Sequence, residues 1–188
     1  MASDVIKLAF VGGMGAGKTT AIRAISDVEP VSTEMPISHA LMGEKTHTTV
    51  ALDYSTIELD GGELLHVYGV PGQRYLNFMW PLVCDGAVGI IVLVAADAGD
   101  MVAQTDMLLV EFAKIAPQAS FAVGVTHTDV SNDFGLLHFR DALTQLGHKL
   151  PVVRLDARDG AQVEALIRIL LSYRYAESVV NQRASTSA

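Results

Sequence analysis

The segment 12–19 constrains the fold of this chain more than any other part of its sequence. It reads Gly-Gly-Met-Gly-Ala-Gly-Lys-Thr and matches the phosphate-binding pattern G-x-x-x-x-G-K-[ST]. That pattern indicates a phosphate-binding loop only where it follows a strand and precedes a helix. Here an apolar run at residues 5–11 precedes it, and a helix is expected over residues 17–28. We therefore expect an α/β domain in which this loop joins the first strand to the first helix.

The residue types of this loop explain its expected chemistry. Glycines allow several backbone N–H groups to point at one anion, and the N-terminus of the following helix reinforces them. Lys18 supplies charge to the β- and γ-phosphates, which also makes it a catalytic candidate, and the Thr19 hydroxyl is a ligand for Mg²⁺. An ordinary glycine-rich turn is the alternative, but the position and the Lys-Thr pair favour a phosphate site. The expected nucleotide-binding residues are Gly12, Gly13, Met14, Gly15, Ala16, Gly17, Lys18, Thr19 and Thr20.

The rest of the chain alternates short apolar strands with amphipathic helices, a pattern typical of a mostly parallel sheet with helices on both faces. We predict six strands, one of them antiparallel because Asp60-Gly61-Gly62-Glu63 indicates a hairpin. After the first, the strands are expected at residues 49–59, 64–70, 86–96, 119–126 and 150–155. Residues 29–48 contain two prolines and no sustained period, so a long loop is expected there.

Three later helices have recognisable ends. Asp100 is expected to cap one that stops before Pro117. Gly147 is expected to end a second, which begins near residue 136. Asp159 and Gln162 resemble a capping box that opens a third, extending to about residue 180. The expected organisation is a single domain over residues 1–180 with a polar, disordered tail at 181–188.

Composition limits the function classes. Half of the 188 residues are hydrophobic, which suits a compact domain, and the net charge of −8 opposes binding to nucleic acid. Cys84 is the single cysteine, so an internal disulfide is excluded and a reducing cytoplasm is expected. The sequence shows no signal peptide, no apolar run of membrane-spanning length and no prenylatable cysteine. We expect a cytoplasmic protein without its own lipid anchor or transmembrane segment, recruited to membranes only through partners.

A second motif brings in a family resemblance. Val70-Pro71-Gly72-Gln73 follows the third expected strand, where small Ras-like GTPases carry D-x-x-G-Q. The resemblance implies that the Gly72 amide contacts a γ-phosphate and that Gln73 orients the attacking water. Gly69 stands where the aspartate of that motif is expected. Together with residues 49–54 and 73–80, this departure resembles the bacterial MglA-type polarity GTPases and the Roadblock-associated GTPases of actinomycete conservon operons. The resemblance extends over residues 5–175 and implies a P-loop NTPase G domain.

The resemblance also implies a threonine that closes over the γ-phosphate and Mg²⁺. Thr49 matches best and has both a metal-binding and a catalytic role by this comparison; Thr48 is the neighbouring alternative. Asp53 lies four residues after Thr49, so strand alternation places both on one face, next to the strand that carries Gly69. Asp53 is therefore a candidate to replace the missing aspartate at the Mg²⁺, although a solvent-facing strand aspartate is the equal alternative.

Two further segments resemble the guanine-reading loops of small GTPases. Thr126-His127-Thr128-Asp129 matches N/T-K-x-D, in which the aspartate accepts hydrogen bonds from guanine N1–H and its exocyclic amine. By this comparison Thr126, His127 and Asp129 bind the base, with His127 in place of the lysine that packs against it. Residues 155–158 occupy the place of the S-A-K loop. There Ala157 is expected to offer its amide to guanine O6 and Arg158 to cover the base.

The expected activity is that of a small regulatory GTPase, which binds GTP or GDP with Mg²⁺ and hydrolyses GTP slowly as a switch. No arginine stands beside Thr49 and Arg74 is more readily a solvent-facing residue, so a partner is expected to complete the site. The resemblance implies a Roadblock-fold dimer as that partner, and the bulky run 78–80 suggests a partner surface. The alternatives are a nucleotide-binding adaptor with little hydrolysis and a P-loop kinase, for which no acceptor pocket or basic lid is evident after residue 100.

Overall fold

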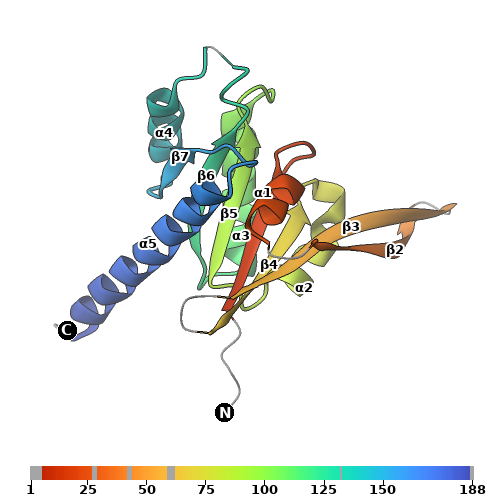
Figure 1. The fold of residues 1–188 in the computed structure, drawn as a ribbon, viewed down its shortest axis with the longest axis horizontal. Coiled ribbons are helices and arrows are strands. Elements are labelled where there is room, and N and C mark those ends of the chain that lie inside the picture. Colours follow the sequence, from red (N-terminus) through yellow and green to blue (C-terminus); the bar gives the residue numbers. More distant parts are fainter. Residues whose placement is uncertain (1–5, 27–28, 42–43, 59–61, 132, 187–188) are drawn as a thin grey trace.

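The computed structural model describes residues 6–26, 29–41, 44–58, 62–131 and 133–186, with only the backbone path for 32–51 and 177–186 (Figure 1). Its centre is a seven-stranded sheet in the order β2-β3-β4-β1-β5-β6-β7. The strands are β1 (Ile6–Gly12), β2 (Val31–Leu41), β3 (Glu44–Glu58), β4 (Leu64–Pro71), β5 (Gly89–Ala95), β6 (Ser120–Thr126) and β7 (Val152–Arg154). The helices are α1 (Lys18–Ile25), the short 3₁₀ helix η1 (Arg74–Met79), α2 (Trp80–Cys84), α3 (Met101–Ile115), α4 (Leu136–Gln145) and α5 (Gly160–Thr186).

The predicted α/β class is confirmed. Strands β4, β1, β5, β6 and β7 pair in parallel, and β3 is antiparallel to both of its neighbours. Helices α1 and α5 cover one face of the sheet, and α2, α3 and α4 cover the other (Figure 1). Because successive strand residues point to opposite faces, the sheet contributes to two separate hydrophobic cores. Phe10 lies on the side of α1 and α5, whereas Val11 lies on the side of α2 and α3.

The prediction of a long loop at residues 29–48 is wrong. Strand β2 and the first residues of β3 occupy this stretch and form an antiparallel hairpin, which raises the strand number from six to seven. Pro36 had argued against a strand, but β2 is an edge strand of the sheet, and an edge strand tolerates proline because one of its sides has no neighbour. The side chains of Thr48 and Thr49 lie outside the described part of the chain.

The expected helix ends are largely confirmed. The Asp100 carboxylate accepts from the backbone N–H of Ala103 at 3.0 Å, and Gly147 ends α4 with a φ of 96°. Asp159 caps α5 by accepting from the backbone N–H of Gln162 at 3.3 Å. The end of α5 was predicted too early, since its backbone stays helical to Thr186. Neither proline nor glycine follows Gly160 to stop it, so the polar residues 181–186 continue the helix.

The bulky run at residues 78–80 divides between core and surface. Trp80 and Met79 are buried, and the Trp80 ring lies 4.6 Å from that of Phe112, measured between centroids. Phe78 stays 45% exposed, and Tyr75 and Leu82 on the same two short helices are more exposed still. One face of this segment therefore anchors η1 and α2, and the other lies at the surface.

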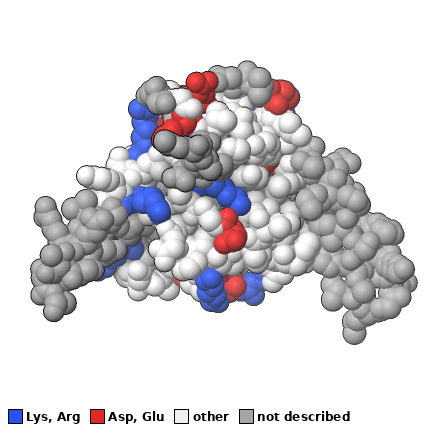
Figure 2. Space-filling view, turned by 90° about the horizontal axis from the view of Figure 1, so that it is seen from below, with Lys and Arg blue, Asp and Glu red and all other residues white. Residues whose placement is uncertain are grey.

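The described residues form no continuous charged surface at the end of the molecule at which β1 begins (Figure 2). Viewed from below, basic and acidic side chains lie there in small separate groups among uncharged residues (Figure 2). Within the described ranges, the helices are all too short or too polar to cross a membrane.

Candidate nucleotide site

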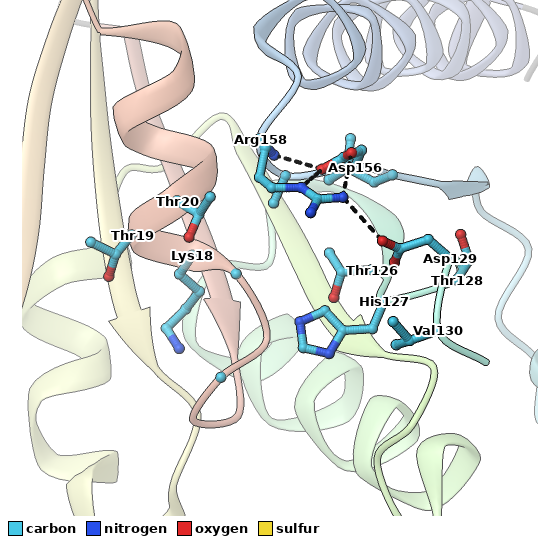
Figure 3. Close-up of a pocket in the computed structure, with 14 residues that line it drawn as sticks. Lys18, Thr19, Thr20, Thr126, His127, Thr128, Asp129, Val130, Asp156 and Arg158 are labelled. Carbon is cyan, nitrogen blue, oxygen red and sulfur yellow. Dashed lines mark hydrogen bonds and ion pairs between the residues drawn. The ribbon is translucent and has the colours of Figure 1, made fainter.

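Three loops meet at the carboxyl ends of the parallel strands and enclose a cavity of about 490 Å³ (Figure 3). They are the loops from β1 to α1, from β6 to α4 and from β7 to α5. Open α/β sheets commonly place ligands at this edge. The lining residues are Gly15, Gly17, Lys18, Thr19, Thr20, Thr126, His127, Thr128, Asp129, Val130, Leu155, Asp156, Ala157 and Arg158. Among the expected residues, Gly15, Gly17, Lys18, Thr19 and Thr20 thus share one cavity with Thr126, His127, Asp129, Ala157 and Arg158.

Left-handed backbone at two glycines shapes the first loop. Gly15 has a φ of 75° and Gly17 a φ of 92°, backbone angles that residues other than glycine rarely adopt. A Cβ atom at Gly17 would also lie 3.0 Å from the Cβ of Ala157, so the loops after β1 and β7 approach each other closely here. Gly13, Met14 and Ala16 do not line this cavity; Ala16 is buried, whereas Met14 is 85% exposed.

Lys18 folds back across its own loop. Its Nζ donates to the carbonyl oxygens of Gly12 at 2.9 Å and Gly13 at 2.8 Å. Burial lowers the pKa of Lys18 from its ordinary value of 10.5 to about 8, an effect that the nearby negative charge of Asp53 partly offsets. An anion placed within reach of this partly desolvated ammonium group would stabilise its positive charge.

Asp53 reaches the first turn of α1 from β3. The Thr19 hydroxyl donates to Oδ2 of Asp53, whose side chain is buried, and Asp53 pairs with Gly69 across β3 and β4. A Cβ atom at Gly69 would lie 3.2 Å from that same oxygen and 3.0 Å from Cδ1 of Ile22. Gly69 therefore leaves the space that the Asp53 carboxylate fills, and the predicted juxtaposition of Asp53 with residue 69 is confirmed.

The segment after β4 contacts the other side of the phosphate loop. The Gly72 backbone N–H donates to the Gly12 carbonyl at 2.8 Å, and a Cβ atom at Gly72 would lie 2.9 Å from the Gly12 carbonyl carbon. Gln73 does not line the cavity, and its Oε1 is buried with no hydrogen-bond partner in the described part of the chain. The Trp80 indole N–H donates to the carbonyl of Pro71 at 2.8 Å and thereby holds this turn.

The loop after β6 begins at a buried threonine and continues through a strained histidine. The Thr126 hydroxyl donates to the Ala16 carbonyl at 3.1 Å, which ties the base side of the site to the phosphate loop. His127 has a φ of 57°, which is rare outside glycine, and its Nδ1 lies 2.9 Å from Oδ1 of Asp97. Its ring projects into the cavity toward the phosphate loop (Figure 3).

Arg158 joins two carboxylates at the mouth of the cavity (Figure 3). Its Nε and Nη2 each donate to Asp156 at 2.8 Å, and Nη2 also donates to Oδ2 of Asp129 at 3.1 Å. The side-chain hydrogen bond from Arg158 lowers the pKa of Asp156 to about 2, and Asp156 in turn raises the pKa of Arg158. Asp156 and Arg158 therefore stay charged near neutral pH.

Asp97, Thr128 and Asp156 belong to this arrangement, although the sequence motifs assign them no binding role. Asp97 lies two residues after β5, so the shared edge of parallel strands could have indicated it. The Asp156 backbone N–H is held by Gln162 Oε1 at 3.0 Å, so the residue expected to cap α5 also fixes the base loop.

The donor set near Thr19 suits a hard cation only in part. Among the described residues, no three or more His, Cys, Asp or Glu gather closely enough to hold a metal. Thr19 and Asp53 contribute two oxygen ligands of the kind that Mg²⁺ prefers, and Mg²⁺ ordinarily takes its remaining ligands from phosphates and water. The pair therefore fits a metal that arrives with a nucleotide.

No protein-family model matches the chain, and no curated protein matches it. The interpretation of the site consequently depends on its geometry.

Proposed function

We propose that this chain is a P-loop G domain that binds GTP and GDP with Mg²⁺, hydrolyses GTP slowly and acts as a nucleotide-dependent switch for a partner protein. One observation carries the proposal: a single cavity has Lys18 and Thr19 on one side and Asp129 on the other, and Ala157 also lines it (Figure 3). Its volume of about 490 Å³ lies within the range of small-ligand sites. A ligand with an anionic group at one end and a hydrogen-bonding ring at the other would satisfy both ends.

The base end favours guanine over adenine. Guanine presents an N1–H and an exocyclic amine side by side, and a carboxylate such as that of Asp129 accepts from both. Adenine presents no such pair of donors to a carboxylate. A site arranged to bond a pair of donors discriminates against a base that lacks one of them. Ala157, whose loop touches Gly17, supplies a backbone N–H for the guanine carbonyl in this proposal.

At the phosphate end, Lys18 and the loop amides would bind the phosphates, while Thr19 and Asp53 would hold Mg²⁺. When bound, the metal would neutralise charge on the phosphate oxygens. Asp53 supports this role because its carboxylate lies beside Gly69, where a Ras-like protein would carry the corresponding aspartate. Thr49 remains a proposed ligand whose side chain is outside the described residues.

Slow hydrolysis is the expected consequence of the groups that the described residues place in the cavity. Gln73 does not line it, and Arg158, the cavity's arginine, is engaged by carboxylates. A positive group at the developing charge and an oriented water would therefore come from a partner or from movement of Gln73. The family resemblance supports a Roadblock-fold protein in that role, and the exposed Tyr75 and Leu82 lie just after Gln73.

The buried Oε1 of Gln73 also favours a second function, that of a nucleotide-binding adaptor with little hydrolysis. Phosphate release in single-turnover reactions with GTP and with ATP separates the two. A switch releases phosphate from GTP alone, and Gln73→Leu abolishes the release while GDP affinity stays within about twofold. An adaptor binds GTP without releasing phosphate at all. Phosphate release from ATP as fast as from GTP would contradict the proposed function.

A further inference from the structure

The contact between Arg158 and Asp129 has a geometry that a simple cover over a base would not need. A guanidinium that stacks on an aromatic ring presents its flat face to the ring. Here the N–H edge of Arg158 is directed at carboxylates: Nε and Nη2 at Asp156, and Nη2 at Asp129 (Figure 3). The contact therefore acts on the orientation of Asp129.

Asp156 is the fixed end of this chain of contacts. Its carboxylate accepts from the backbone N–H of Arg158 at 2.9 Å as well as from the side chain, and its own backbone N–H is held by Gln162. Arg158 is thus held to Asp156 by two hydrogen bonds from its guanidinium and one from its backbone N–H before it reaches Asp129. Asp129 lies on a different loop, after β6, and its side chain is 59% exposed. Without Arg158 its carboxylate would have rotational freedom.

Stability does not explain the arrangement, because exposed ion pairs contribute little to folding. We propose that Arg158 is a specificity-determining positioning residue that, anchored by Asp156, fixes the rotation of the Asp129 carboxylate so that both N–H donors of guanine are bonded together. This inference rests on the proposed guanine site. A carboxylate has about four lone-pair positions, so Arg158 takes one and leaves enough for two donors from the base.

Inosine diphosphate is a selective probe of this role. Hypoxanthine keeps the N1–H and the 6-carbonyl of guanine but lacks the 2-amino group, so it makes only one of the two bonds to Asp129. The ratio of GDP affinity to inosine diphosphate affinity therefore reports the second bond and the carboxylate orientation that it requires. Stacking, phosphate binding and Mg²⁺ binding are common to both nucleotides and cancel in the ratio.

The test measures the affinities of GDP, inosine diphosphate and ADP with Mg²⁺ for the full chain and four variants. Arg158→Ala is expected to lower GDP affinity about three- to tenfold and inosine diphosphate affinity less than about twofold, as expected for one lost hydrogen bond. Asp156→Ala should also lower the ratio of GDP affinity to inosine diphosphate affinity, because it releases the Arg158 guanidinium from its anchor. Arg158→Lys should restore only part of it, since an ammonium cannot bridge both carboxylates in the same way. Glu164→Ala is the matched control: it removes an exposed carboxylate from the start of α5 that does not line the cavity, and should leave the ratio unchanged.

Three outcomes would overturn the inference. Equal losses for GDP and inosine diphosphate in Arg158→Ala would identify a base cover, and tighter GDP binding would identify a competitor for Asp129. A wild-type chain that binds GDP no more tightly than ADP would instead remove the proposed function itself, and the positioning role with it. Thermal unfolding of each variant, expected within a few degrees of wild type, separates these results from misfolding.

Discussion

Asp53 and Gly69 depend on each other at the scale of single residues. The carboxylate from β3 occupies the space beside Thr19 that any side chain at position 69 would enter. An acidic group is thereby kept at the proposed metal position although the adjacent strand carries glycine. In the proposed site the acidic group therefore comes from β3 and not from β4, and a motif comparison along β4 alone would miss it.

Removing this carboxylate should weaken the response to Mg²⁺. Asp53→Ala is expected to reduce Mg²⁺ affinity in the presence of GDP roughly tenfold or more, a common cost of losing a carboxylate near a metal. The measurement is GDP dissociation over a Mg²⁺ titration. Ser55→Ala is the control, because Ser55 lies buried on the same strand but bonds Ser26 instead. The double variant Asp53→Gly with Gly69→Asp should recover part of the Mg²⁺ dependence of GDP dissociation. An unchanged Mg²⁺ response in Asp53→Ala would contradict the proposed role of Asp53 at the metal.

Lys18 predicts a pH dependence of folding stability. Its pKa is about 8 in the folded protein and near its ordinary 10.5 when unfolded, so the unfolded chain binds more protons between these values. Stability should therefore rise with pH in that window, and the penalty of the buried charge is fully present below pH 8. Between pH 7 and pH 10, the unfolding free energy of the wild type should rise by about 2 kcal/mol relative to that of Lys18→Met. Urea unfolding of both, without nucleotide, measures this gain, and a constant difference across the range would refute it.

At the scale of elements, the site depends on a close approach between the turn after β4 and the phosphate loop. Gly72→Ala would bring a methyl group to about 3 Å from the Gly12 backbone and to 3.1 Å from Leu108. The Gly72 to Gly12 hydrogen bond should lengthen or break, with a cost of roughly 1–3 kcal/mol in unfolding free energy. Gly99→Ala is the control, because its new methyl group would meet open space. Equal unfolding free energies for the two variants would show that the approach tolerates a side chain.

The element boundaries show what the sequence can predict and what it cannot. Asp100 and Gly147 determine helix ends through local chemistry, so these ends can be predicted from the sequence. Pro36 misleads, because whether a proline is tolerated depends on the strand's place at the sheet edge, which is a property of the whole sheet. The bond between Arg158 and Asp129 joins two loops 29 residues apart, and neither loop alone indicates it.

At the scale of the whole molecule, parallel strand order brings the site together. Strands β1, β6 and β7 are distant in sequence, yet the sheet places their carboxyl ends along one edge, so loops of independent sequence can read different parts of one ligand. The chain is acidic overall, with Lys18 as the lysine that lines the cavity. Selectivity must therefore come from this local arrangement rather than from general attraction of anions.

The most direct test of the account compares Mg²⁺-GDP with Mg²⁺-ADP in a binding titration of the full chain, followed by calorimetry and by the fluorescence of Trp80. Trp80 is a suitable reporter because its indole N–H holds the Pro71 carbonyl next to Gly72. The account predicts that GDP binds at least roughly 100-fold more tightly than ADP, since only guanine pairs both of its donors with Asp129. Equal affinities, or no binding of either nucleotide, would contradict it.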